Sequence, residues 1–156
     1  MVIRDAKRIL ELIEEIKNLE IKMESLSSES EIACRLKTIG GFGAVCSAEL
    51  AGEIGVIERF ESEASLALYL GMAVLDNSSG KYEGTKASKH VNYRAKAAMM
   101  TATAKHIHTS KESEVYYNKK RKEGKKHNQA VRSLGRHMIR VIWSLIKKKR
   151  NYEQNN

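Results

Sequence analysis

The chain has 156 residues, enough for one domain of ordinary size or a small domain plus a long helix, but not for two domains with separate cores. Hydrophobic residues make up 42% and charged residues 30%, which excludes a disordered chain and a membrane-embedded one. The formal net charge of +9 conceals two halves of opposite sign, because residues 1–80 carry 8 Lys/Arg and 14 Asp/Glu, whereas residues 81–150 carry 20 Lys/Arg and 4 Asp/Glu. The basic half favours a polyanionic partner, and nucleic acid is the leading class.

The composition also indicates the fold class and the compartment. There is no proline, so nothing forces a kink, and we predict an all-α fold punctuated by glycines. No apolar run approaches the roughly 20 residues of a membrane span, and charged residues stand where a secretion signal needs an apolar stretch. We therefore expect a cytoplasmic protein with no membrane partner. Cys34 and Cys46 are twelve residues apart and form no CxxC pair, so we expect reduced core residues.

A three-heptad pattern predicts a coiled-coil helix over residues 1–28. Apolar side chains at the a and d positions form a seam made of Ile9, Leu12, Ile16, Leu19, Met23 and Leu26. Isoleucine at a with leucine at d favours a parallel dimer, so we expect a homo-oligomer through this helix. The same stripe would also serve for packing against later helices of the same chain. The serine-rich segment 25–30 ends this helix and provides the N-cap of the next one.

Residues 29–150 are expected to form a helical DNA-binding domain, followed by a tail over residues 151–156. The domain begins with a glycine turn at Gly40, Gly41 and Gly43, between a short apolar helix and a small-residue helix from Ala44 to Gly52. This spacing is that of a helix-hairpin-helix, in which glycines let a phosphate approach and the free amides of the second helix bind it. The alternative is an ordinary helical hairpin with a glycine turn.

A further helix is predicted from an N-cap at Ser62 to a stop at Gly71, and a polar loop follows it. The loop contains Ser78 and Ser79, directly before Gly80 and Lys81. A serine beside cations can act as a nucleophile, because the cations lower its pKa and hold the attacked phosphate. Serines are also common in loops without any chemical role, so both interpretations stay open at this point.

The last long helix is predicted from about Asn128 to Arg150. Its apolar stripe, expected to be buried, consists of Val131, Leu134, Met138, Val141, Ile142, Leu145 and Ile146. Arg132, Arg136 and Arg140 recur every four residues, so one face carries cations about 6 Å apart. Because no acidic residues alternate with them, this arginine ladder favours a phosphate backbone over a solvated face.

No metal site is indicated in the basic half. His106 and His108 are two residues apart and point in different directions on a helix, so we expect surface or phosphate-contacting side chains. Tyr116 and Tyr117 are expected to be packing or base-stacking aromatics. The basic half contains four carboxylates, which are too dispersed to hold magnesium: Glu83, Glu112, Glu114 and Glu123.

Several segments, taken in order, resemble one family, the insertion-sequence 110/116/902 transposases, which are viewed as RNA-guided serine recombinases. The resemblance covers roughly residues 30–148. The matching segments are Leu36–Gly43 with Ala48 and Glu53-Ile54-Gly55, Arg59-Phe60 with Ser62, Leu66 with Tyr69-Leu70-Gly71-Met72, Ser79-Gly80, Ser88-Lys89 with Asn92, and Glu123-Gly124-Lys125 with Ala130 and Arg136. Two departures are Gly40, where the family has proline, and His90-Val91, where it has Arg-Gly.

The resemblance implies a reaction and a set of partners. Such transposases join a metal-binding, resolvase-like domain with four acidic residues to a C-terminal domain whose serine attacks a DNA phosphate. That serine matches Ser79, with Ser78 as the register alternative. The implied partners are DNA and a guide RNA. With the glycine turn and the arginine ladder, the residues expected to bind nucleic acid are Gly40, Gly41, Gly43, Lys81, Lys86, Lys89, Asn92, Lys125, Arg132, Arg136 and Arg140.

The sequence begins at the predicted coiled coil, so we expect the acidic domain to be missing from this chain. Attack on a phosphodiester normally needs a divalent metal, so magnesium is expected only together with that domain, and this chain is expected to hold no metal or cofactor. The expected function is the DNA-binding, serine-nucleophile portion of a DNA transposase, inactive as an isolated chain. The alternative is a non-catalytic nucleic-acid-binding module or a decayed transposase remnant. A basic RNA-binding protein unrelated to transposition ranks last.

Overall fold

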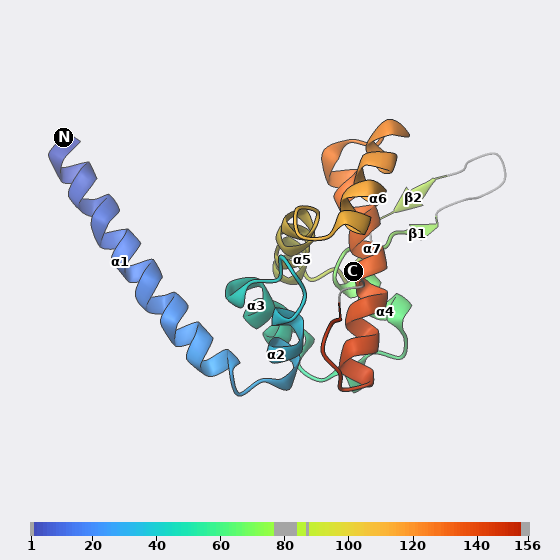
Figure 1. The fold of residues 1–156 in the computed structure, drawn as a ribbon, viewed down its shortest axis with the longest axis horizontal. Helices are drawn as coiled ribbons and strands as arrows, with labels where there is room; N and C mark the ends of the chain where they lie inside the picture. The colour runs from blue at the N-terminus through green and yellow to red at the C-terminus, as the bar shows by residue number, and fades with distance from the viewer. Residues whose placement is uncertain (1, 77–83, 87, 154–156) are drawn as a thin grey trace.

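The computed structural model describes residues 2–76, 84–86 and 88–153. Over these residues the chain is built of α-helices joined by short turns, as the sequence predicts (Figure 1). The exceptions are one turn of 3-10 helix and a pair of two-residue antiparallel strands, β1 (Leu75–Asp76) and β2 (Thr85–Lys86). None of the described helices is both long and apolar enough to cross a membrane.

Helix α1 (Val2–Ser27) projects away from the other helices (Figure 1). The side chains of its predicted seam lie mostly in solvent, since Ile9 is 57%, Ile16 54% and Leu19 59% exposed. Only the last turns of α1, around Met23, lie beside α3. Among the described residues the seam is therefore left uncovered by later helices of the same chain, except near Met23. Its pairing in a coiled coil stays a prediction.

Two helices follow, joined by the glycine turn. Helix α2 (Glu31–Lys37) begins at Ser30, whose hydroxyl accepts a hydrogen bond from the amide of Ala33 at 3.3 Å, as the serine-rich segment predicts. Helix α3 (Ala44–Ile54) packs against α2. Between them Gly41 has φ of +87°, a conformation that side chains other than glycine rarely adopt. The order of short helix, glycine turn and second helix is as predicted.

The 3-10 turn η1 (Ile57–Arg59) leads to helix α4 (Glu63–Tyr69). The predicted N-cap is confirmed, because the Ser62 hydroxyl accepts from the amide of Ser65 and the Ser65 hydroxyl accepts from the amide of Ser62. This reciprocal pair satisfies two amides that the first turn of a helix leaves unbonded. Gly71, with φ of +66°, ends the helical segment as expected.

Helices α5 (Tyr93–His106), α6 (Lys111–Lys122) and α7 (His127–Lys147) complete the fold. Helix α7 packs against α2, α4, α5 and α6, so it runs through the middle of the helical body. Its predicted stripe is buried, with Val141 only partly so. The helix ends three residues earlier than predicted, at Lys147.

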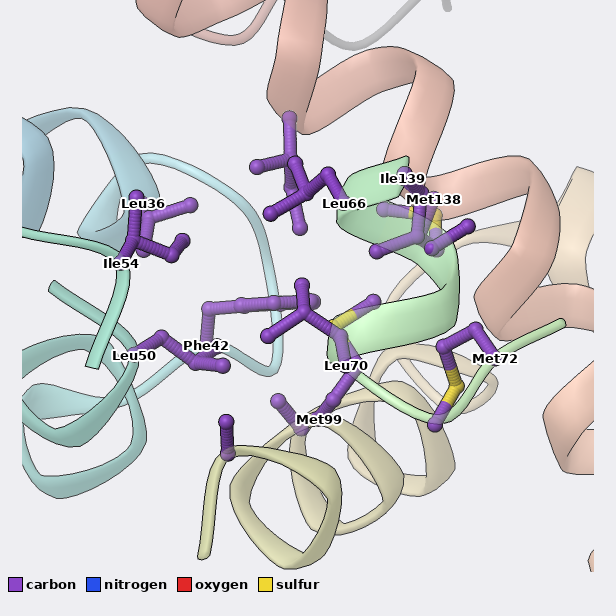
Figure 2. Packing of buried hydrophobic residues seen from close by; sticks show 14 of the residues in the cluster. Leu36, Phe42, Leu50, Ile54, Leu66, Leu70, Met72, Met99, Met138 and Ile139 are labelled. Atoms are coloured by element: carbon purple, nitrogen blue, oxygen red, sulfur yellow. The ribbon is translucent and has the colours of Figure 1, made fainter. Parts of the chain in front are cut away.

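The apolar core lies between α7 and the helices around it. Figure 2 shows Phe42 of the glycine turn between Leu50 and Leu70, with Met99 of α5 nearby. All four side chains are at most 1% exposed. The core thus joins the glycine turn, α3, α4 and α5 into one body. The expected burial of the cysteines was wrong for Cys34, which is exposed.

Candidate nucleic-acid interface

The arginine ladder lies along α7, but its members differ in their partners. Arg136 donates to the carboxylate of Glu63 on α4, and Arg140 Nε lies 3.6 Å from the same carboxylate oxygen. Arg132 forms no ion pair, and its buried Nε has no hydrogen-bond partner among the described residues. No acidic residue of α7 alternates with the arginines, as the sequence shows, but Glu63 of α4 lies beside two of them. The acid comes from a different helix, 73 residues before Arg136 in the chain.

Arg132 lines a pocket of about 510 Å³ on one side of α7. The wall on α7 consists of side chains at intervals of three or four residues, and Thr85 of β2 and Tyr116 of α6 face them. Met72, Ala73 and Val74 form the apolar part of the lining. The described lining residues include no carboxylate. Of the residues predicted to bind nucleic acid, this pocket brings together Lys125, Arg132 and Arg136.

The last turn of α6 and the turn that leads to α7 carry a second concentration of positive charge. We define the basic turn as Lys119, Lys122, Lys125 and Lys126, none of which forms an ion pair among the described residues. The one acid in this stretch, Glu123, is engaged by Lys120 at 2.8 Å. The basic turn therefore presents four lysines that are not ion-paired within the described residues, although Glu123 lies near enough to Lys119 and Lys125 for both to lower the pKa of its carboxyl.

The glycines of the predicted phosphate-binding turn divide into two groups. A Cβ added at Gly40 would lie 2.7 Å from Thr109 Oγ1, and one at Gly41 would lie 2.5 Å from the amide nitrogen of His106. These two positions are thus in close contact with the end of α5. Gly43 is exposed, and a Cβ there would meet nothing within 4 Å. Of the three glycines, Gly43 is the one where an approaching phosphate meets open space.

The expectation that His106 lies at the surface was wrong. It is 2% exposed, and its Nδ1 donates to the carbonyl of Gly40 at 2.6 Å. Its ring lies edge-on to Phe42 and to Tyr152, with centroids 6.4 and 6.3 Å away. Burial lowers the pKa of the His106 imidazole, and the hydrogen bond to Gly40 opposes this shift. His106 therefore fastens the glycine turn to α5, whereas His108 is exposed as expected.

Tyr116 and Tyr117, predicted to be packing or stacking aromatics, both contact histidines of α7. The Tyr116 hydroxyl lies 3.0 Å from His137 Nε2, and the Tyr117 hydroxyl lies 2.8 Å from His127 Nδ1. Both tyrosines are half-buried against the core. These contacts join α6 to α7 beside the basic turn. The tyrosines therefore pack, and base stacking by them stays a prediction.

Several of the residues that carry the family resemblance meet at the start of α5. The Asn92 side chain accepts from the amides of Arg94 and Ala95 at 3.0 Å, which caps this helix. Its amide nitrogen donates to Glu53 at 2.5 Å and to the Tyr69 hydroxyl at 2.8 Å. Asn92 thus links α3, α4 and α5. No local sequence signal could show this network, because its members are spread over about forty residues.

Arg59 belongs to the same network. It donates to the carbonyl of Glu53 at 3.1 Å, and its guanidinium lies 5.0 Å from the ring centroids of Phe60 and Tyr69. Such contacts between a cation and aromatic rings are favourable. Arg59 therefore holds η1 against the ends of α3 and α4.

Two predicted residues, Lys86 and Lys89, are exposed near β2. Ser78, Ser79 and Lys81 lie outside the described residues. In the part of the chain that the structure describes, no three His, Cys, Asp or Glu side chains are grouped so that they could hold a metal ion.

Comparison with known proteins gives consistent matches. The model of the transposase IS116/IS110/IS902 family matches residues 33–118. The chain is 32% identical over 149 residues to the insertion element IS900 uncharacterized 42 kDa protein of Mycobacterium paratuberculosis, covering 94% of this chain and 37% of that protein. It is 27% identical over 146 residues to the insertion element IS116 uncharacterized 44.8 kDa protein of Streptomyces clavuligerus, covering 93% and 37%.

A third relative is the insertion element IS110 uncharacterized 43.6 kDa protein of Streptomyces coelicolor, 29% identical over 141 residues, or 90% of this chain and 35% of that protein. The chain thus spans little more than a third of the length of these relatives. The family match covers more than half of the chain and includes the glycine turn and the network around Asn92. The chain belongs to the IS116/IS110/IS902 family of transposases.

Proposed function

We propose that this chain is the DNA-binding, serine-bearing portion of a DNA transposase, with the glycine turn acting as a helix-hairpin-helix. The observation that carries the proposal is the excess of positive charge around the start of α7, where Arg132 and the basic turn form no ion pairs among the described residues, in a chain that belongs to a transposase family. Lysines and arginines that lack carboxylate partners release counterions when they contact phosphates, and this drives binding without reading the sequence. A guide RNA, which the resemblance also implies, would offer the same phosphate chemistry.

The proposed reaction is phosphoryl transfer to Ser79. The serine oxygen forms an ester bond with a DNA phosphorus, one bridging phosphorus–oxygen bond of the DNA breaks, and the leaving oxygen takes up a proton while the serine loses one. A divalent metal would neutralise the phosphate. We propose that magnesium is held by an acidic, resolvase-like domain and that this chain tested alone is inert with magnesium.

Self-association through α1 is part of the same proposal. Exposed isoleucine and leucine side chains repeat along this helix at heptad spacing, and an exposed stripe of this length is unfavourable in water. A parallel coiled coil with a second copy would bury it. Two copies would place two basic turns on one assembly, which suits a substrate with many phosphates.

The test is a covalent adduct. The chain is mixed with a matched DNA substrate, magnesium and an acidic resolvase-like domain, and protein–DNA adducts are separated under denaturing conditions. The proposal predicts an adduct that is lost in Ser79→Ala but kept in Ser78→Ala, while DNA affinity changes little in either variant.

Two other outcomes contradict the proposal. An adduct lost only in Ser78→Ala would shift the nucleophile by one residue. DNA binding without an adduct in any sample would favour the non-catalytic nucleic-acid-binding module instead.

A further inference from the structure

Arg132, which lines the pocket beside α7, has one buried nitrogen without a partner among the described residues. Arg132 is half-buried, its Nε is hidden from solvent, and this nitrogen has no hydrogen-bond acceptor among the described residues. A buried donor without a partner is costly, and native structures usually supply one. An anion seated beside Arg132 would supply acceptors to this guanidinium.

The neighbouring charges do not satisfy Arg132. Glu63 is the acid near this part of α7, and it is engaged by Arg136 and Arg140. None of the described residues that line the pocket is a carboxylate. Lys125, in the turn before α7, adds a second cation to the lining, and it forms no ion pair among the described residues. The local charge is positive and open to an anion.

The neutral lining residues also offer donors. The Gln129 side-chain oxygen is already used, since it accepts from the amide of Lys126 at 2.9 Å. The NH₂ group of the same side chain forms no hydrogen bond with the described residues and can donate to a ligand. Thr85 of β2 lines the pocket and carries a hydroxyl. Ser133 differs, because its hydroxyl donates to the carbonyl of Gln129 at 2.9 Å. The pocket thus presents charged and neutral donors to one volume.

We propose that this pocket binds a single phosphate group of a nucleic-acid backbone, with Arg132 and Lys125 as the charged donors and Gln129 and Thr85 as the neutral ones. Phosphate fits this donor set, because its oxygens accept several hydrogen bonds and arginine binds it in a fork. The volume of about 510 Å³ leaves room for the adjoining sugars, which would contact the apolar lining at the exposed Val74. The inference rests on the proposed DNA binding and assigns one contact within it.

The placement ties this contact to the proposed chemistry. Val74 and Thr85 both line the pocket. Val74 precedes and Thr85 follows the segment that contains Ser79. If Arg132 binds a phosphate, the nucleic-acid backbone therefore lies next to the two residues that flank that segment. Arg136 and Arg140 form ion pairs with Glu63, so Arg132 is the arginine of the ladder that we expect to contact phosphate.

The experiment measures binding of the full chain to a fluorescent DNA duplex over a series of salt concentrations. Arg132→Gln is compared with Arg150→Gln, which removes the same charge from an exposed residue three positions beyond the end of α7. We expect Arg132→Gln to weaken binding at least tenfold and to reduce the slope of log K against log salt by about 0.9. Arg150→Gln should change affinity less than twofold. Arg132→Lys keeps the charge without the fork and should lie between wild type and Arg132→Gln, which covers the case in which Arg132→Gln does not fold.

A second arm uses inorganic phosphate and pyrophosphate as competitors and as ligands in a thermal shift assay. If the wild type binds DNA but Arg132→Gln and Arg132→Lys behave like Arg150→Gln, the pocket proposal is overturned and the proposed function stands. If the wild type binds inorganic phosphate through Arg132 but does not bind DNA, the backbone assignment and the proposed function both fail. Wild-type DNA binding that depends on Arg132, with only weak competition by inorganic phosphate, supports the proposal.

Discussion

Helices α1 and α7 are the two longest in the described chain, with 26 and 21 residues, and both carry apolar side chains at helical spacing. Helix α7 buries its stripe against four other helices, whereas α1 leaves Ile16 and Leu19 in solvent. The same pattern thus has two outcomes, because periodicity shows that a face is suited to burial but not which chain buries it. We expect α7 to determine the stability of the fold and α1 to determine its association.

The largest expected effect is a difference in how much α7 and α1 contribute to the free energy of unfolding. Ile142 of α7 is fully buried and Ile16 of α1 is 54% exposed. Ile142→Ala leaves a cavity in the core and should lower the free energy of unfolding by about 2–5 kcal/mol. Ile16→Ala should change it by less than about 0.5 kcal/mol at protein concentrations where the chain is monomeric. Urea denaturation measures both values. Equal losses would show that α1 is also part of the folded body.

The next largest effect is expected at the glycine turn, where a substitution tests whether the turn packs against α5. Gly41→Ala places a side chain at φ of +87° and 2.5 Å from the backbone of His106. We expect a loss of about 2 kcal/mol or more, from the strained backbone and the clash. Gly43→Ala is the control, because it meets open space, and it should leave stability nearly unchanged. A stable Gly41→Ala would mean that the turn is not held against α5.

Association through α1 can be broken without unfolding the chain. Leu19→Glu places a charge in the seam, and sedimentation should show loss of the dimer expected for the wild type. Ile21→Glu is a matched control, since Ile21 is 64% exposed, close to the 59% of Leu19, but lies outside the seam. It should leave the dimer intact. A wild-type chain that is monomeric at high micromolar concentration would contradict the predicted pairing.

A smaller effect is expected in the pH dependence of stability, through the buried His106 at the end of α5. His106 is buried with a lowered pKa, whereas in the unfolded chain its pKa is about 6.5. The unfolded state therefore binds more protons as pH falls through that value, and stability should be lost below about pH 6.5. His106→Gln should flatten the dependence, while the exposed His108→Gln should not. Some slope should remain, because burial and nearby arginines also lower the pKa of His137. An unchanged profile in His106→Gln would contradict the buried neutral imidazole.

Much of the fold could be predicted from local signals. The first and last long helices follow from periodicity, and the Ser62 cap and the Gly71 stop follow from the conformations these residues favour. The glycine turn could be located but not oriented. Its contact with His106 joins residues 66 positions apart, so no pattern in the surrounding sequence could show it.

The interface was harder to predict for the same reason. A ladder of arginines can be read along one helix, but whether each arginine is free depends on Glu63, which only the fold brings close. The pocket around Arg132 likewise combines β2, α6 and α7. The serines proposed for chemistry lie outside the described residues, so Ser79 rests on the family resemblance.

The most direct test of the account asks whether DNA binds beside α7 or responds only to net charge. Two double variants each lower the formal charge from +9 to +7. One is Lys119→Gln with Lys122→Gln at the basic turn, and the other is Lys7→Gln with Lys17→Gln on α1, outside the seam. Duplex binding is measured against salt concentration. The account predicts that the slope of log K against log salt falls by about 1.8 for the first variant and stays unchanged for the second. Equal losses in the two variants would contradict it.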